Sequence, residues 1–124
     1  MNRTVLFVCP HGAAKSRVAA ACFNRIAPTG WTATSAGLDP GPELSKTAAR
    51  MLAGTDAAGY LDLAPPRPIA DVTSASRVVG IDCAPSEATD HWALRHPEFD
   101  SVMRDEIRTH VESLAAELGS LSDS

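Results

Sequence analysis

The stretch TVLFVCPHGAAKS, residues 4–16, decides the fold of this chain of 124 residues. Its apolar run, residues 5–8, is typical of a central strand that is buried on both faces of a sheet. Gly12 interrupts the apolar pattern, and helical spacing begins at about Ala14. We therefore predict a strand that ends at Cys9, a short loop of small residues and then a helix.

This arrangement of strand, loop and helix predicts an anion site at Cys9. The first backbone N–H groups of a helix have no partner inside the helix, and they point toward whatever lies in the preceding loop. The same donors stabilise a thiolate, so a cysteine in this position is both a nucleophile and a neighbour of bound oxyanions. The sequence therefore favours phosphate-like chemistry at the end of the strand.

The composition indicates one globular domain over residues 1–124, in which we expect 119–124 to be a frayed tail. Hydrophobic residues make up 44% of the chain and charged residues 21%, which is typical of a folded protein with one core. The formal net charge of −4 argues against nucleic acid or an anionic membrane as a partner. An anion site therefore has to be a local pocket.

The three cysteines, Cys9, Cys22 and Cys83, do not have the spacing of a zinc site. Their odd number argues against a disulfide framework, so we expect a reducing, cytoplasmic location. Cys22 lies on the apolar face of the first helix, where a role in the core is expected. We expect no metal and no cofactor. We also expect no membrane partner, since no segment approaches the roughly 20 apolar residues that cross a bilayer.

The remaining segments alternate between strands and helices. Strands are expected at 31–36, 77–81 and 92–94, with a short helix after Ser45, a helical turn at 71–75 and a last helix from Asp100 or Ser101 to Gly119. This order predicts an α/β three-layer sandwich, with a small parallel sheet of about four strands and helices on both faces. In such sheets the ligand binds at the carboxyl ends of the strands, where Cys9 falls.

The order of these motifs resembles the low-molecular-weight protein tyrosine phosphatases and their relatives, the thioredoxin-coupled arsenate reductases. The resemblance rests on VLFVC with its loop and Ser16, SAG at 35–37, RVVGID at 77–82, HW at 91–92, a later proline, and RDEIRTHV at 104–111. It extends from about Thr4 to Leu118. It implies the low-molecular-weight phosphatase-like fold and an oxyanion-binding loop.

In that family the loop has the pattern C-x5-R-S, and here it extends from Cys9 to Ser16. The resemblance implies that Cys9 attacks phosphorus and forms a phosphocysteine, while the Ser16 hydroxyl steadies the thiolate. It also implies that the loop backbone holds the three equatorial oxygens of the transferred group. The residues that would bind phosphate in this way are Pro10, His11, Gly12, Ala13, Ala14 and Lys15.

Lys15 stands where the family has arginine. An arginine fork donates two parallel charge-assisted hydrogen bonds to phosphate, whereas lysine offers a point charge on a flexible stem. Losing one preorganised donor of this kind typically costs a factor of about 100 to 1,000 in rate. Arg17 is not expected to replace the missing arginine, because it lies two residues further along the helix and its side chain leaves at another angle.

The general acid also departs from the family pattern. The family has an Asp–Pro pair in the loop before the last helix, and here the pair is His96 and Pro97. A histidine can donate a proton near neutral pH, so His96 is the candidate acid. Asp90, Glu98 and Asp100 are alternatives, and nothing in their spacing selects one.

Three functional hypotheses follow. The leading one is a cysteine-dependent phosphatase, weakened by Lys15, that hydrolyses a small phosphomonoester or a phosphorylated protein. The alternative is a non-catalytic module that binds phosphate or a similar oxyanion, because two of the family's chemical groups are replaced. The third is an arsenate reductase or thiol redox enzyme that uses Cys9 with Cys83, although the further cysteine that such reductases carry a few residues later is absent.

Overall fold

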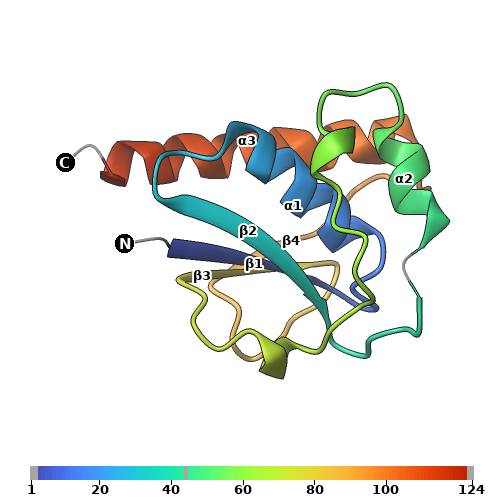
Figure 1. Cartoon of the computed structure of the whole chain (residues 1–124), viewed down its shortest axis with the longest axis horizontal. Helices are drawn as coiled ribbons and strands as arrows, with labels where there is room; N and C mark the ends of the chain where they lie inside the picture. The colour runs from blue at the N-terminus through green and yellow to red at the C-terminus, as the bar shows by residue number, and fades with distance from the viewer. Residues whose placement is uncertain (1–2, 44, 123–124) are drawn as a thin grey trace.

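The computed structural model describes residues 3–43 and 45–122, in which four parallel strands form one sheet (Figure 1). The strand order is β2-β1-β3-β4. The strands are β1 (Arg3–Cys9), β2 (Trp31–Gly37), β3 (Arg77–Ile81) and β4 (Asp90–Trp92). The α-helices of the described residues are α1 (Lys15–Ile26), α2 (Lys46–Leu52) and α3 (Ser101–Ser122), with short 3-10 helices η1 (Ala58–Tyr60) and η2 (Ile69–Asp71). The predicted α/β fold with a small parallel sheet is confirmed.

β1 lies inside the sheet because its side chains are apolar on both faces. It pairs with β2 along its whole length, up to the pair of Cys9 and Gly37, and residues 5–8 also pair with β3. Residues 5–8 are at most 1% exposed. Because the strands are parallel, their carboxyl ends share one edge of the sheet, and Cys9 ends its strand at that edge.

The two faces of the sheet are covered differently. Side chains alternate along a strand, so Val5 and Phe7 pack into the main core with α1, α2 and α3, while Leu6 and Val8 pack with η2 and nearby loops. The expectation of α-helices on both faces therefore needs a correction, because all three of the described α-helices cover one face (Figure 1). Three prolines in residues 65–68 prevent a regular helix in the segment that leads to the second face.

The prediction that α3 stops at Gly119 was wrong, because the helix continues to Ser122. A glycine inside a helix costs only about 1 kcal/mol relative to alanine, and the apolar side chains of α3 that pack into the main core outweigh that cost. The predicted tail at 123–124 lies outside the described residues. None of the helices in the described part of the chain is long and apolar enough to cross a membrane.

Two shorter elements lie a few residues from their predicted positions. The helical turn expected at 71–75 is η2, which begins earlier because Ile69 packs into the cluster on the second face. The strand expected at 92–94 is β4, which includes Asp90 because the Arg77 guanidinium holds its carboxylate at 2.9 Å. In both cases a tertiary contact, absent from the local pattern, sets the boundary.

Two glycines bring the loop after β1 against the end of β2. A Cβ on Gly12 would lie 2.6 Å from the Gly37 nitrogen, and one on Gly37 would lie 2.5 Å from the His11 carbonyl carbon. Gly12 also has a φ of +67°, in the left-handed region that favours glycine. The position of the loop above the sheet edge therefore depends on backbone packed directly on backbone.

We expect Gly37→Ala to destabilise the protein by about 1–3 kcal/mol, because its methyl group would overlap backbone atoms that cannot move independently. Gly59→Ala is the matched control, since a Cβ there meets no atom within 4 Å. Its effect should stay within about 0.5 kcal/mol. Urea unfolding of the two variants checks this, and equal midpoints would contradict the close packing.

A candidate oxyanion site at the end of β1

The loop after β1 turns its carbonyl groups outward. Each carbonyl from Cys9 to Ala14 accepts a hydrogen bond at 2.9 to 3.3 Å. The donors are the backbone N–H groups of Leu38, Asp39, Gly41, Ser45 and Val18 and the side-chain Nε of Arg17. Within the described residues, the backbone N–H groups of residues 11–17 donate to no acceptor. These N–H groups, with the start of α1, are available to an anion.

Cys9 lies inside this loop. Cys9 is only 3% exposed, and its Sγ lies 3.1 Å from the Oγ of the fully buried Ser16. If Cys9 is ionised, the Ser16 hydroxyl can donate to the thiolate. The predicted nucleophile and its hydroxyl partner are therefore adjacent.

A pocket of about 200 Å³ opens above the loop. Its lining residues are Cys9, Pro10, His11, Ala13, Ala14, Lys15, Ser45 and Phe99. Of the loop residues predicted to bind phosphate, Gly12 is absent from the lining because it packs against Gly37. The ring of His11 is held at the rim, where its Nδ1 lies 3.1 Å from the Asp39 carbonyl oxygen.

The Lys15 ammonium at the rim is already engaged by a carboxylate. Its Nζ lies 2.6 Å from Asp82 Oδ2, and it also sits 5.5 Å from the centre of the Phe99 ring. Asp82 follows β3 with a φ of +55°, and its Oδ1 accepts a hydrogen bond from the Leu94 N–H at 2.9 Å. The positive charge that Lys15 offers to an anion is thus largely neutralised by a fixed neighbour.

The structure places His96 beside this pocket without making it part of the lining. Its Nε2 lies 2.9 Å from Asp100 Oδ2, and its ring lines a separate groove with Glu106 and His110. Phe99, from the same loop, is the residue that reaches the Cys9 pocket. The expected general acid is therefore turned toward Asp100 in this structure.

Two of the three alternative acids, Asp90 and Asp100, are also engaged elsewhere. Asp90 is held by Arg77, and Asp100 accepts hydrogen bonds from the first N–H groups of α3 as well as the His96 contact. His96, Glu98 and Asp100 bring potential ligand atoms within 4.8 Å of one another, the only such grouping among the described residues. Because Asp100 already holds the start of α3, these three residues fit a structural role better than a metal site.

The other two cysteines do not line the pocket above Cys9. Cys22 is buried in the main core, and burial raises the pKa of its thiol. Cys83 packs with the cluster on the second face, while Cys9 belongs to the main core. Burial and then the charge of Cys9 raise the pKa of Cys83, whose Sγ lies 3.4 Å from the Val8 carbonyl oxygen.

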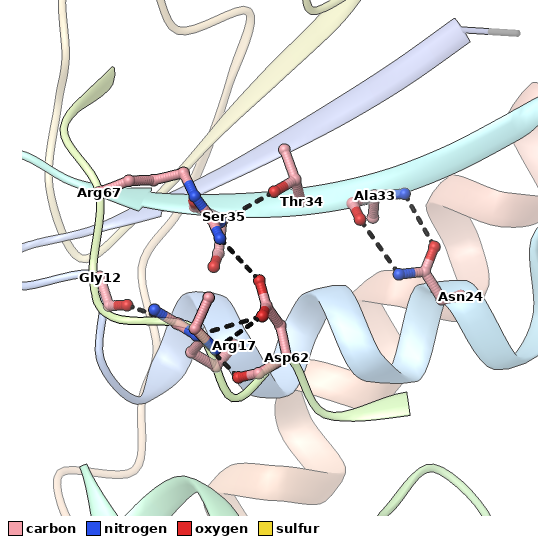
Figure 2. A network of polar contacts seen from close by, with 9 residues as sticks. Gly12, Arg17, Asn24, Ala33, Thr34, Ser35, Asp62 and Arg67 are labelled. Atoms are coloured by element: carbon pink, nitrogen blue, oxygen red, sulfur yellow. Dashed lines mark hydrogen bonds and ion pairs between the residues drawn. The ribbon is translucent and has the colours of Figure 1, made fainter. Parts of the chain in front are cut away.

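Sequence reasoning missed the polar network behind the loop (Figure 2). Arg17 is 1% exposed and its Nε donates to the Gly12 carbonyl at 2.9 Å. Its Nη1 donates to the Asp62 carbonyl at 2.7 Å, and the Asp62 carboxylate pairs with Arg67 at 2.8 Å. The only sequence signal was a charged residue among the apolar positions of α1. Asp62 and Arg67 lie 45 and 50 positions after Arg17, so no local spacing indicates that the three side chains meet.

No protein-family model matches this sequence, and no curated protein matches it. Solved structures do match. An arsenate reductase from Archaeoglobus fulgidus is 26% identical with a TM-score of 0.65, and the match covers 94% of this chain and 98% of that one. The chain has the fold of arsenate reductases and low-molecular-weight phosphatases.

Two further neighbours, one an arsenate reductase and one a phosphatase, show the same fold. An arsenate reductase in the phosphate binding state is 22% identical with a TM-score of 0.74, covering 93% of this chain and 98% of that one. A low-molecular-weight protein tyrosine phosphatase from T. tengcongensis is 17% identical with a TM-score of 0.69, covering 94% of this chain and 99% of that one. The resemblance found in the sequence is therefore confirmed at the level of the superfamily.

Asp100→Asn should reduce the loss of stability in acid. The contact with His96, then the backbone N–H groups of α3, hold the pKa of Asp100 below its ordinary value. A carboxyl group with a lowered folded pKa stabilises the protein above its unfolded pKa, about 3.9, and that stabilisation disappears as the pH falls through the folded pKa. Asparagine can still cap the helix but does not titrate here.

Urea unfolding between pH 6 and pH 2 measures this effect. The wild type should lose more stability than Asp100→Asn over this interval. Parallel curves over the whole range would show that Asp100 does not carry the linkage.

Proposed function

We propose that this chain is a cysteine-dependent phosphomonoester hydrolase of the low-molecular-weight phosphatase type, with a weakened site. One observation carries the proposal: protein donors hold the carbonyl groups of residues 9–14, the N–H groups of residues 11–17 donate to no acceptor among the described residues, and Cys9 Sγ lies 3.1 Å from the Ser16 hydroxyl. Because protein donors already hold the carbonyls, the loop can receive an oxyanion without rearranging. The neighbours that are named as phosphatases, or as binding phosphate, support this proposal.

In this mechanism the Cys9 thiolate attacks phosphorus. The sulfur–phosphorus bond forms as the bond to the leaving oxygen breaks, and the loop N–H groups at the start of α1 stabilise the equatorial oxygens. The leaving oxygen takes a proton from a general acid or from water. A water molecule then attacks the phosphocysteine, which releases inorganic phosphate and returns the Cys9 thiolate beside Ser16.

Two features argue that this activity is weak. Lys15 is paired with Asp82 at 2.6 Å, so an entering phosphate has to compete with a carboxylate for a single ammonium. His96 contacts Asp100 and not the pocket above Cys9. Substrates whose leaving group needs little protonation, such as activated aryl phosphates, are therefore expected to react best.

Hydrolysis of p-nitrophenyl phosphate by the wild type, Cys9→Ser and Lys15→Arg tests the proposal. Cys9→Ser should lose turnover because its hydroxyl is a much weaker nucleophile than a thiolate. Lys15→Arg should raise turnover by about tenfold or more, since a fork can donate two parallel bonds to the phosphoryl group. Urea unfolding of each variant is the control for folding, and full turnover by a folded Cys9→Ser would refute the mechanism.

The second candidate function is an oxyanion-binding protein without turnover. The Lys15–Asp82 pair and the position of His96 favour it, because both reduce catalysis more than they reduce binding by the loop backbone. Calorimetric titration with inorganic phosphate distinguishes the two. Binding to the wild type, with no turnover by any of the three proteins, would support this candidate over the first.

The arsenate reductase neighbours favour a third candidate, in which Cys9 and Cys83 act together. Reduction of arsenate to arsenite takes two electrons, and two thiols supply them by forming a disulfide. Cys83 packs with a different cluster from Cys9, so this step would need the two thiols to come into contact. Intact mass after incubation with arsenate decides, because a disulfide removes two hydrogens from the wild type and cannot form between these positions in Cys83→Ser.

A further inference from the structure

Arg17 is the largest side chain among those that are almost completely buried, at 1% exposure. Burying an ionised group is costly unless it is paired, and a surface helix does not require an arginine on its inner face. The position of Arg17 directly behind the loop therefore needs a physical reason. Figure 2 shows its guanidinium between Gly12, in the loop, and Asp62, in the segment that follows η1.

The hydrogen bonds of Arg17 hold the loop from behind. Its Nε donates to the Gly12 carbonyl at 2.9 Å, and this is the residue with a φ of +67°. Its Nη1 donates to the Asp62 carbonyl at 2.7 Å. The C=O and N–H of a trans peptide point in opposite directions, so fixing the Gly12 carbonyl also fixes the Ala13 N–H, a donor that Arg17 does not touch.

The charge of Arg17 is only partly compensated. The nearest carboxylate, on Asp62, lies 3.8 Å from Arg17 Nη1 but 2.8 Å from Arg67 Nη2, so two guanidinium groups share one carboxylate. The remaining nitrogen of Arg17, Nη2, is buried and has no hydrogen-bond partner among the described residues. A net positive charge therefore lies beneath the loop, where burial reduces screening by solvent.

Cys9 is close enough to Arg17 for their charges to interact. Burial lowers the pKa of Arg17, whereas the carboxylate of Asp62 and, more weakly, the thiolate of Cys9 act in the opposite direction. A cation fixed behind the loop attracts a negative charge in front of it. An arginine keeps its proton even when burial opposes it, which makes this charge permanent.

We propose that Arg17 is a positioning residue that acts as the fixed cation of the oxyanion site, from behind the loop, while Lys15 at the front is held by Asp82. The inference deepens the proposed function and depends on its anion site. It assigns to a residue outside the C-x5-R-S positions part of the electrostatic work that an arginine at position 15 would perform. Arg17 does not line the pocket, so it acts on bound anions through its charge and through Gly12.

The test compares variants that change this charge in opposite directions. Arg17→Met removes the cation at similar size, Arg17→Lys retains it, and Asp62→Asn removes the carboxylate that offsets it. Asp62 suits this purpose because its side chain is 40% exposed and asparagine can still accept the Ala64 N–H bond. Arg25→Met is the control, a charge removed from the same helix at a surface pair with Asp56.

Two readouts are measured without any turnover. The first is the pH profile of Cys9 alkylation by iodoacetamide, with the modified cysteine mapped by peptide mass. The second is the concentration of inorganic phosphate that protects Cys9 from alkylation. Arg17→Met should shift the alkylation midpoint to higher pH and weaken phosphate protection by about tenfold, the equivalent of one pKa unit. Arg17→Lys and Arg25→Met should keep the wild-type midpoint.

Asp62→Asn separates a charge effect from a purely structural one. If the charge of Arg17 acts on the site, Asp62→Asn should shift the midpoint to lower pH and strengthen phosphate protection. If the network only holds the loop in place, both Asp62→Asn and Arg17→Met should weaken protection. A folded Arg17→Met with wild-type values, or an Asp62→Asn with weaker protection, would overturn the inference.

The outcomes remain informative if Arg17→Met does not fold. Asp62→Asn then decides, because a higher midpoint or weaker phosphate protection in that variant would contradict a role for charge. The proposed function and the role of Arg17 are tested by different outcomes. Absence of turnover leaves both readouts measurable, whereas turnover by the wild type with an unchanged midpoint in Arg17→Met would overturn the role of Arg17 alone.

Discussion

The outward orientation of the carbonyl groups between Cys9 and Ala14 is the constraint on which the candidate site depends. Four of these groups are held by donors in the segment between β2 and α2, and the Gly12 and Ala14 carbonyls are held by Arg17 and Val18 of α1. The direct contact of Gly12 with Gly37 allows these donors to come close enough. The N–H groups of residues 11–17, in the loop that follows Cys9 and at the start of α1, donate to no acceptor among the described residues.

The charges around the loop are arranged in two layers. At the front, Lys15 and Asp82 form a close pair whose charges cancel. Behind the loop, Arg17 and Arg67 share Asp62, and the sum is positive. The proposed anion site is therefore compatible with a net charge of −4, because two guanidinium groups share one carboxylate behind the loop. Substitutions in the Lys15–Asp82 pair and substitutions in the Arg17–Asp62–Arg67 group can therefore affect anion binding and catalysis to different extents.

Much of the candidate site was predictable because its parts are close together in the sequence. Cys9, Lys15 and Ser16 lie on one strand, loop and helix, so local periodicity and the small residues between them were sufficient. The role of His96 was harder to predict, because the orientation of its side chain depends on a contact with Asp100 at the start of α3. The pair of Lys15 with Asp82 joins the ends of two strands, and no spacing in the sequence indicates it.

By itself, the sequence determined the order of the strands and helices, the buried position of β1 and the placement of Cys9 at the carboxyl edge of the sheet. These features follow from apolar periodicity and from the parallel pairing that alternating strands and helices impose. Only the tertiary structure decided where the charges go: Arg17 behind the loop, Lys15 on Asp82, and His96 turned away. A charged side chain can reach several partners from one backbone position, so its contacts depend on which distant segments the fold brings within a few ångströms.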